Sequence, residues 1–99
     1  MIVIGGHIRL DPAKREEAIA AATEMMTETA KETGCVTYVF SASFDDPGLF
    51  HIFEEWESQE HLNAHFVAPH MATFQAAMAN FGVTERSIHK YEASDKAAL

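Results

Sequence analysis

The 99-residue sequence contains one cysteine, few basic residues and no long apolar run. Because Cys35 is alone, no disulfide can form within the chain, which fits a reducing cytoplasm. No segment approaches the roughly 20 apolar residues that are needed to cross a bilayer. The N-terminal stretch MIVIGGHIRLD has no basic flank and a short apolar run, so it is typical of a strand and not of a signal peptide. We therefore expect a cytoplasmic protein.

Positive charge is scarce throughout the chain. Seven Lys and Arg residues stand against 15 Asp and Glu residues, which gives a net charge of −8. Nucleic-acid binding depends on Lys and Arg that neutralise phosphates, so this balance argues against nucleic acid and against anionic membranes as partners. A chain of this length forms one domain with a modest core, which a partner surface would extend.

Apolar spacing and turn residues predict one domain, residues 1–92, followed by a polar tail, residues 93–99. Asp11 as N-cap and Pro12 at the first helical position begin a helix, and Gly34 ends it. Ser58 caps a second helix, which Pro69 interrupts or restarts. The predicted strands are residues 2–10, 35–44, 49–56 and 83–91, and the first helix spans residues 12–33.

This element order, βαββαβ, is that of an α+β, ferredoxin-like fold with a four-stranded antiparallel sheet and both helices on one face. Pro47 and Gly48 favour a type II turn between the second and third strands. Both faces of the predicted sheet nevertheless carry apolar side chains. Val3 and Ile4 project to opposite faces, and so do Ile52 and Phe53. Soluble proteins usually bury such a face. We therefore predict a homodimer whose two sheets pack face to face.

The segment HLNAHFVAPHM, residues 61–71, holds three of the six histidines. His61 and His65 lie one helical turn apart, and Glu57 precedes them by another turn, so a metal site is one interpretation. The segment lacks the adjacent glutamate of the metalloprotease pattern, and we predict a solvent-facing His61 and no bound metal. His65 and His70 flank the Pro69 break, where either could face a cavity and accept a proton.

Other polar residues lie on predicted strands. His7 follows Gly5 and Gly6, which indicate either a β-bulge or a close approach by a ligand or another backbone. Glu54 shares a strand face with Ile52 and Trp56, and we expect it to form a structural ion pair with Arg9 or Arg86. Aromatic residues either form the core, which is the commoner case, or line a ligand site. They are Tyr38, Phe40, Phe44, Phe53, Phe66, Phe74 and Phe81.

Two stretches of the chain, GCVTY and FEEWESQEHLNAHFVAPHM, resemble the antibiotic biosynthesis monooxygenase domain, and within it the bacterial quinol monooxygenase type. The similarity runs from about residue 2 to residue 91. Its most specific residues are Glu54, Trp56, Ser58, His65 and His70. The resemblance implies a dimeric α+β barrel that oxidises a small quinol or phenol with O₂, without flavin, haem or metal.

Within that resemblance, His65 or His70 is the expected base and His7 a hydrogen-bond donor. The expected substrate-binding residues are Tyr38, Glu54, Trp56, Phe66 and Phe74. Haem-degrading relatives carry asparagine, tryptophan and a haem-ligating histidine where this chain has His7, His65 and Gln75, which argues against haem breakdown. Two alternatives stay open, a non-catalytic dimeric module that binds a small molecule and an isomerase of a small signalling metabolite.

Overall fold

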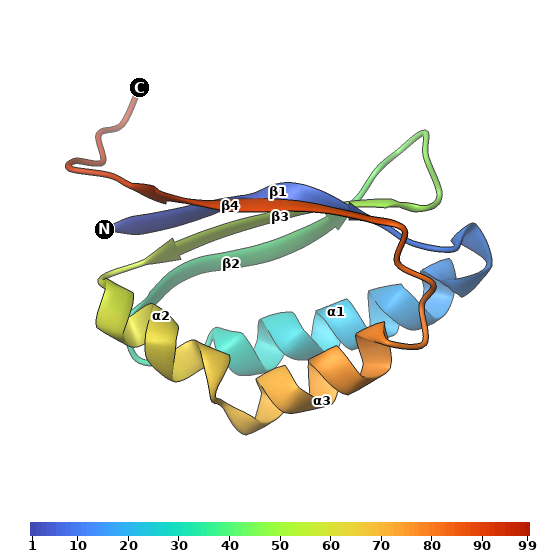
Figure 1. Cartoon of the computed structure of the whole chain (residues 1–99). Helices are drawn as coiled ribbons and strands as arrows, with labels where there is room; N and C mark the ends of the chain where they lie inside the picture. Colours follow the sequence, from blue (N-terminus) through green and yellow to red (C-terminus); the bar gives the residue numbers. More distant parts are fainter.

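The computed structural model describes all 99 residues and confirms the α+β, ferredoxin-like fold. A four-stranded antiparallel sheet lies over the helices, which all cover the same sheet face (Figure 1). No helix combines the length and apolar content that crossing a membrane requires. The elements are β1 (Ile2–Arg9), a 3-10 turn η1 (Pro12–Lys14), α1 (Arg15–Thr29), β2 (Cys35–Ala42), β3 (Leu49–Trp56), α2 (Gln59–Phe66), α3 (Pro69–Met78) and β4 (Glu85–Glu92).

The first helix begins as predicted but ends early. The Asp11 side chain accepts a hydrogen bond from the Ala13 amide, and η1 precedes α1. The helix ends at Thr29, four residues before the predicted end, because the chain then turns through short i to i+3 hydrogen bonds. This turn brings the Glu32 side chain into contact with the second helical region. Gly34, with a φ of 83°, completes the reversal into β2.

The second helical region is divided as predicted. The Ser58 hydroxyl accepts a hydrogen bond from the His61 amide and caps α2, whereas Pro69 occupies the first turn of α3.

The turn between β2 and β3 differs from the prediction. Leu49 N bonds Asp46 O across 3.2 Å, but Gly48 lacks the positive φ of a type II turn. Glycine is needed there because a Cβ would lie 2.6 Å from the Leu10 carbonyl oxygen.

The sheet order is β2-β3-β1-β4, with β4 at one edge. Its register aligns three rows of side chains that face the helices. These rows are Tyr38, Glu54, Ile4 and Lys90; Phe40, Ile52, Gly6 and Ile88; and Ala42, Phe50, Ile8 and Arg86. The first two rows contribute to a core around Trp56, Met25 and Leu62. A smaller core surrounds Phe50 and Phe81.

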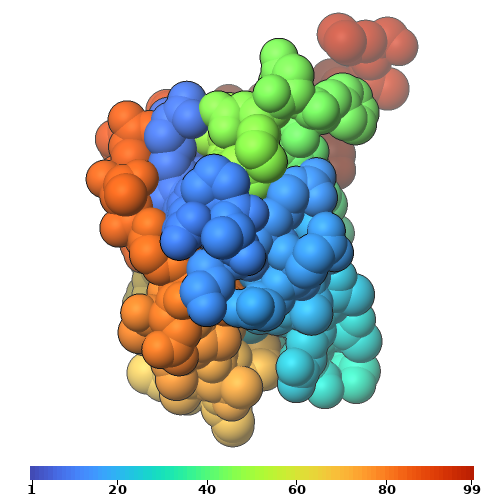
Figure 2. Space-filling model, turned by 90° about the vertical axis from the view of Figure 1, so that its right-hand side faces the viewer, coloured from blue at the N-terminus to red at the C-terminus, as the bar shows by residue number.

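Of the two alternatives for Gly5 and Gly6, a β-bulge is absent, because β1 pairs without a register shift on both sides. The irregularity lies in β2 instead, between Cys35 and Thr37. Gly6 marks a close backbone approach, since a Cβ there would lie 2.0 Å from the Ser87 carbonyl oxygen. The segment before β4 also lies against the turn between β1 and α1 (Figure 2), with Asp11 N bonded to Phe81 O across 2.9 Å.

The outer sheet face has no helix over it (Figure 1). Val39 and Phe53 are cross-strand partners on this face, on β2 and β3, and Val3 and Tyr91 are cross-strand partners on the same face, on β1 and β4. Three of these side chains are more than 40% exposed. The aromatic residues divide between the two expected roles and the surface: Tyr38 and Phe81 are buried, whereas Phe44, Phe53 and Phe66 are exposed.

Candidate functional site

A cavity of about 330 Å³ lies between the inner sheet face and helices α2 and α3. Its wall is mostly hydrophobic, with Ile52 and Phe40 from the sheet and Phe66, Met71 and Phe74 from the helices. Ligand cavities typically combine such walls with a few polar groups. The polar side chains among the lining residues are Glu54, Gln59, His65, Gln75, Arg86, His89 and Lys90.

His65 is the buried imidazole of this cavity. It lies three residues after Leu62 on the inward side of α2, and it is 1% exposed. Its Nδ1 lies 2.6 Å from Oε2 of Glu32. Because a carboxylate can only accept, Nδ1 carries the proton of this bond, and the neutral ring keeps an acceptor at Nε2. Nε2 makes no hydrogen bond within the chain.

Aromatic rings hold the imidazole of His65 in place. The centre of the Trp56 ring system lies 4.7 Å from the centre of the His65 ring, and the Tyr38 ring lies 5.3 Å away in an edge-on orientation. Trp56 is fully buried and does not line the cavity, whereas Tyr38, Glu54, Phe66 and Phe74 do. Four of the five predicted substrate-binding side chains therefore border the cavity, and Trp56 packs behind them.

His70 lies behind His65 and outside the cavity. Its Nε2 is 2.8 Å from the same Oε2 atom of Glu32, so one carboxylate oxygen joins both histidines. His70 borders a second pocket, of about 400 Å³, between α1 and α3, together with Glu24 and Glu28. The structure thus separates the two candidate bases, because only His65 reaches the cavity between sheet and helices.

Glu54 is a second titratable group in the cavity wall. Its Oε1 accepts a hydrogen bond from Trp56 Nε1–H at 2.8 Å. The predicted ion pair with Arg9 or Arg86 is wrong, because Arg9 points to the outer sheet face and Arg86 forms no ion pair. Without a cation beside it, burial raises the pKa of Glu54 to about 7, although the Trp56 hydrogen bond lowers it. Burial and the Glu54 charge together raise the Tyr38 pKa far above its usual value.

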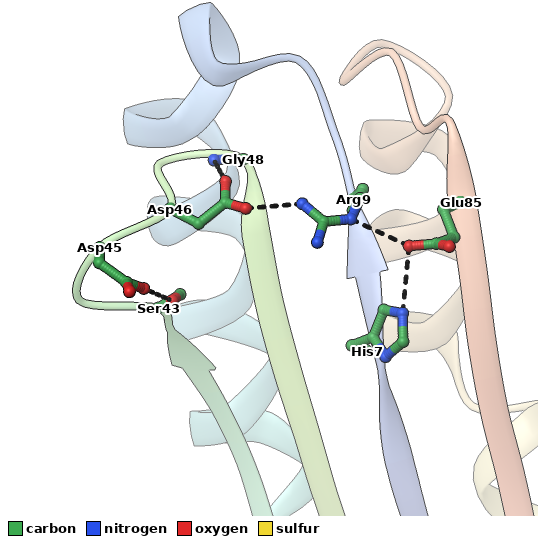
Figure 3. Close-up of polar contacts among 7 residues, drawn as sticks. All are labelled: His7, Arg9, Ser43, Asp45, Asp46, Gly48 and Glu85. Atoms are coloured by element: carbon green, nitrogen blue, oxygen red, sulfur yellow. Dashed lines mark hydrogen bonds and ion pairs between the residues drawn. The ribbon is translucent and has the colours of Figure 1, made fainter.

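His7 does not join this site. Its side chain lies on the outer sheet face, where its Nε2 is 3.1 Å from Oε2 of Glu85 (Figure 3). Arg9 bridges the same Glu85 oxygen, at 3.0 Å, and Asp46, at 2.6 Å. The Arg9 guanidinium beside Asp46 lowers the pKa of that carboxyl. These contacts tie β1 to β4 and to the β2–β3 hairpin, away from the cavity.

The predicted arrangement around His61 is also different in the structure. His61 is half-buried, not solvent-facing, because its ring packs against Gly34 and its Nδ1 lies 2.7 Å from the Ser58 hydroxyl. The set of Glu57, His61 and His65 therefore does not form. A different metal-competent group is present, in which the ligand atoms of Glu32, His65 and His70 lie within 4.8 Å of one another. Two hydrogen bonds to Oε2 of Glu32 join these three side chains to one another.

Comparison with known proteins identifies the family. The family model described as "Antibiotic biosynthesis monooxygenase" matches residues 1–77. The chain belongs to this family, and so to the class of ferredoxin-like proteins that the fold defines. A crystal structure from Deinococcus radiodurans has a TM-score of 0.90, with 23% identity, and the match covers 100% of this chain and 98% of that one. At that identity the likeness concerns the fold alone.

Two sequence relatives are more informative about the chain itself. "Uncharacterized protein sll1783" from Synechocystis is 33% identical over 73 residues, which are 74% of this chain and 50% of that protein. The chain thus matches only half the length of this relative. "Putative monooxygenase YcnE" from Bacillus subtilis is 26% identical over 76 residues, covering 77% of this chain and 80% of that protein.

Proposed function

We propose that the protein is a cofactor-independent monooxygenase that oxidises a small phenol or quinol with O₂, with His65 as the base. The observation that carries this proposal is the orientation of His65. Its Nδ1 is bound to Glu32, and its Nε2 is left as an acceptor in a ring that borders an apolar cavity. Family membership and the name of the Bacillus relative support the reaction class.

The chemistry requires little more than deprotonation in a dry site. His65 Nε2 takes the phenolic proton, and the phenolate then transfers one electron to O₂ far more readily than the phenol does. The resulting superoxide and phenoxyl radical combine at a ring carbon that carries hydrogen. Loss of water from this hydroperoxide leaves a quinone, so that one phenol and one O₂ give one quinone and one water. The phenolic proton and the ring hydrogen both end in that water.

Glu54 supplies a second proton site for this sequence. With a pKa of about 7, its carboxyl exchanges a proton near neutral pH and can protonate the departing hydroxide. The apolar wall excludes water, which strengthens interactions with the phenolate. His7, on the outer face, has no part in the proposed mechanism. His70 acts through Glu32 and does not contact the substrate.

Oxygen consumption tests the proposal directly. Metal-free protein would be mixed with a panel of reduced quinols and phenols, and O₂ uptake would be followed with an electrode. We expect uptake above the uncatalysed rate, and a loss of about 100-fold or more in kcat for His65→Asn. His51→Asn is the matched control, because His51 is an exposed histidine on the outer face. Uptake no faster than the background across the panel would refute the reaction.

We also propose that two copies pair through their outer sheet faces. The apolar side chains of Val3, Val39, Phe53 and Tyr91 support this arrangement, because a soluble chain usually covers such a surface. Residues 1–92 would form the paired domain. The tail, residues 93–99, contains no helix or strand, and its Lys96 lies 3.4 Å from Glu55.

A further inference from the structure

The distribution of positive charge in this acidic chain is uneven. Five of its seven basic side chains lie within 4 Å of a carboxylate. These are Arg9, Lys14, Arg15, Lys31 and Lys96. The remaining two, Arg86 and Lys90, have no carboxylate partner, and both border the cavity between sheet and helices. In a chain with 15 acidic residues, the uncompensated cations are therefore gathered at one apolar cavity.

The register of β4 explains this placement. Arg86, Ile88 and Lys90 alternate onto the inward face of the edge strand, opposite Ile8, Gly6 and Ile4. At a rise of about 3.3 Å per residue, the Cα atoms of Arg86 and Lys90 lie about 13 Å apart along the strand. Ile88 lies between them, and its partner Gly6 contributes no side chain. The edge of the cavity thus has a cation at each end and the apolar Ile88 side chain between them.

The side chains of Lys90 and Arg86 differ in the hydrogen bonds that they make within the chain. Lys90 Nζ donates a hydrogen bond to Oε1 of Gln59, at 2.8 Å, so a neutral group at the start of α2 already holds it. Arg86 makes no side-chain hydrogen bond within the chain, and it keeps all five N–H donors for a ligand. Its planar fork matches the two oxygens of a carboxylate. Both side chains are exposed, so a ligand can reach them at the rim of the cavity.

We propose that the cavity selects an aromatic anion, whose ring lies against Ile52 and Ile88 and whose carboxylate is held by Arg86. Lys90 adds positive potential at the other end of the same edge. This inference names the substrate class and rests on the proposed function only for the oxidation that follows binding. The binding step itself needs no O₂ and no base, so it can be tested alone.

Calorimetry with a matched ligand pair tests this selectivity. 2-Naphthoate and 2-naphthamide have the same ring and nearly the same size, but only the naphthoate is charged, and neither has a phenol group to react. We expect the protein to bind naphthoate about tenfold more tightly than naphthamide, as a charge-assisted hydrogen bond predicts. Arg86→Gln should abolish that preference and leave naphthamide affinity unchanged. Lys90→Gln should reduce it less.

Arg15→Gln is the control, because Arg15 lies on α1 beside Glu16, away from the cavity. Equal affinity of the unaltered protein for both ligands, or no binding of either, would overturn the inference. So would a naphthoate preference that survives Arg86→Gln. The His65→Asn protein separates the two proposals, since it should lose O₂ uptake and retain the naphthoate preference. A retained preference without any O₂ uptake in the unaltered protein would refute the reaction but support the aromatic-anion site.

Discussion

The indole N–H of Trp56 donates a hydrogen bond to Oε1 of Glu54 across 2.8 Å, and both side chains are buried in the inner sheet face. This contact gives Glu54 a fixed orientation but no compensating positive charge. Burial is therefore the main cause that raises its pKa from 4.5 to about 7. A change in the protonation state of Glu54 therefore changes the free energy of unfolding of the protein.

We predict that Glu54 makes the protein less stable as the pH rises. Because its folded-state pKa is raised, the stabilising effect of its proton is complete below about pH 4.5 and is lost as the pH rises through about 7. The pKa difference corresponds to an upper bound on the order of 3 kcal/mol in the free energy of unfolding. Glu54→Gln, which retains an acceptor for Trp56, should remove this pH dependence.

Urea unfolding of both proteins at pH 5 and pH 8 would measure the effect. The variant should gain stability relative to the unaltered protein on going from pH 5 to pH 8. Glu85→Gln is the control, because Glu85 lies on the exposed outer face. An identical pH dependence of the unaltered protein and Glu54→Gln would contradict the prediction.

Glu32 is predicted to act as a positioning residue for His65. Glu32→Gln keeps the side-chain shape but removes the charge that favours the Nδ1–H tautomer and stabilises the imidazolium. We expect kcat for O₂ uptake to fall at least tenfold, whereas KM changes little because Glu32 does not line the cavity. Glu17→Gln, on the exposed side of α1, should leave both constants unchanged. A rise in KM alone would assign Glu32 to substrate binding instead.

Alanine substitutions at the two adjacent glycines of β1 should have different effects on the free energy of unfolding. A Cβ at Gly6 would lie 2.0 Å from the Ser87 carbonyl oxygen, and backbone atoms of β4 cannot move without disturbing the sheet. We expect Gly6→Ala to lower the free energy of unfolding by about 2 kcal/mol or more. A Cβ at Gly5 would meet nothing within 4 Å, so Gly5→Ala should be neutral or slightly stabilising. Thermal unfolding of the two variants gives the comparison, and equal losses would show that the close approach to β4 is not the cause.

Pairing of the outer sheet faces gives a prediction about size in solution. Phe53 is 45% exposed at the centre of this face, and Phe44 is fully exposed in the β2–β3 hairpin. We expect the unaltered protein to be a dimer and Phe53→Glu to be a monomer, because the buried charge would be unpaired. Phe44→Glu should remain dimeric. Light scattering after size-exclusion chromatography distinguishes these states, and a monomeric unaltered protein would exclude the interface.

Local sequence signals were sufficient for most of the fold. Asp11, Ser58 and Pro69 act where they were predicted to act, because capping and the missing amide of proline are properties of a few neighbouring residues. The end of α1 was not predictable in the same way. The polar stretch KETG is compatible with either helix or turn, and the turn observed there carries Glu32 into contact with two histidines.

The candidate site was predictable only in part for a related reason. The spacing around Pro69 singled out His65 and His70, but the residue that joins them lies 33 positions before His65 and has no distinguishing local pattern. Strand alternation placed Glu54 on the correct face. The same alternation places Arg9 on the opposite face, and this excludes Arg9 as an ion-pair partner of Glu54. The true partner of Glu54, Trp56, lies two residues further along the same strand face.

The edge position of β4 has a consequence for how this protein could diversify. β4 pairs with β1 alone, and its inward side chains, those of Arg86, Ile88 and Lys90, border the cavity. Exchanges at positions 86, 88 and 90 would therefore alter the charge and shape of this edge of the cavity without replacing Glu32, Trp56 or His65. Libraries confined to these three positions offer a compact route to variants that accept different ligands with the same chemistry.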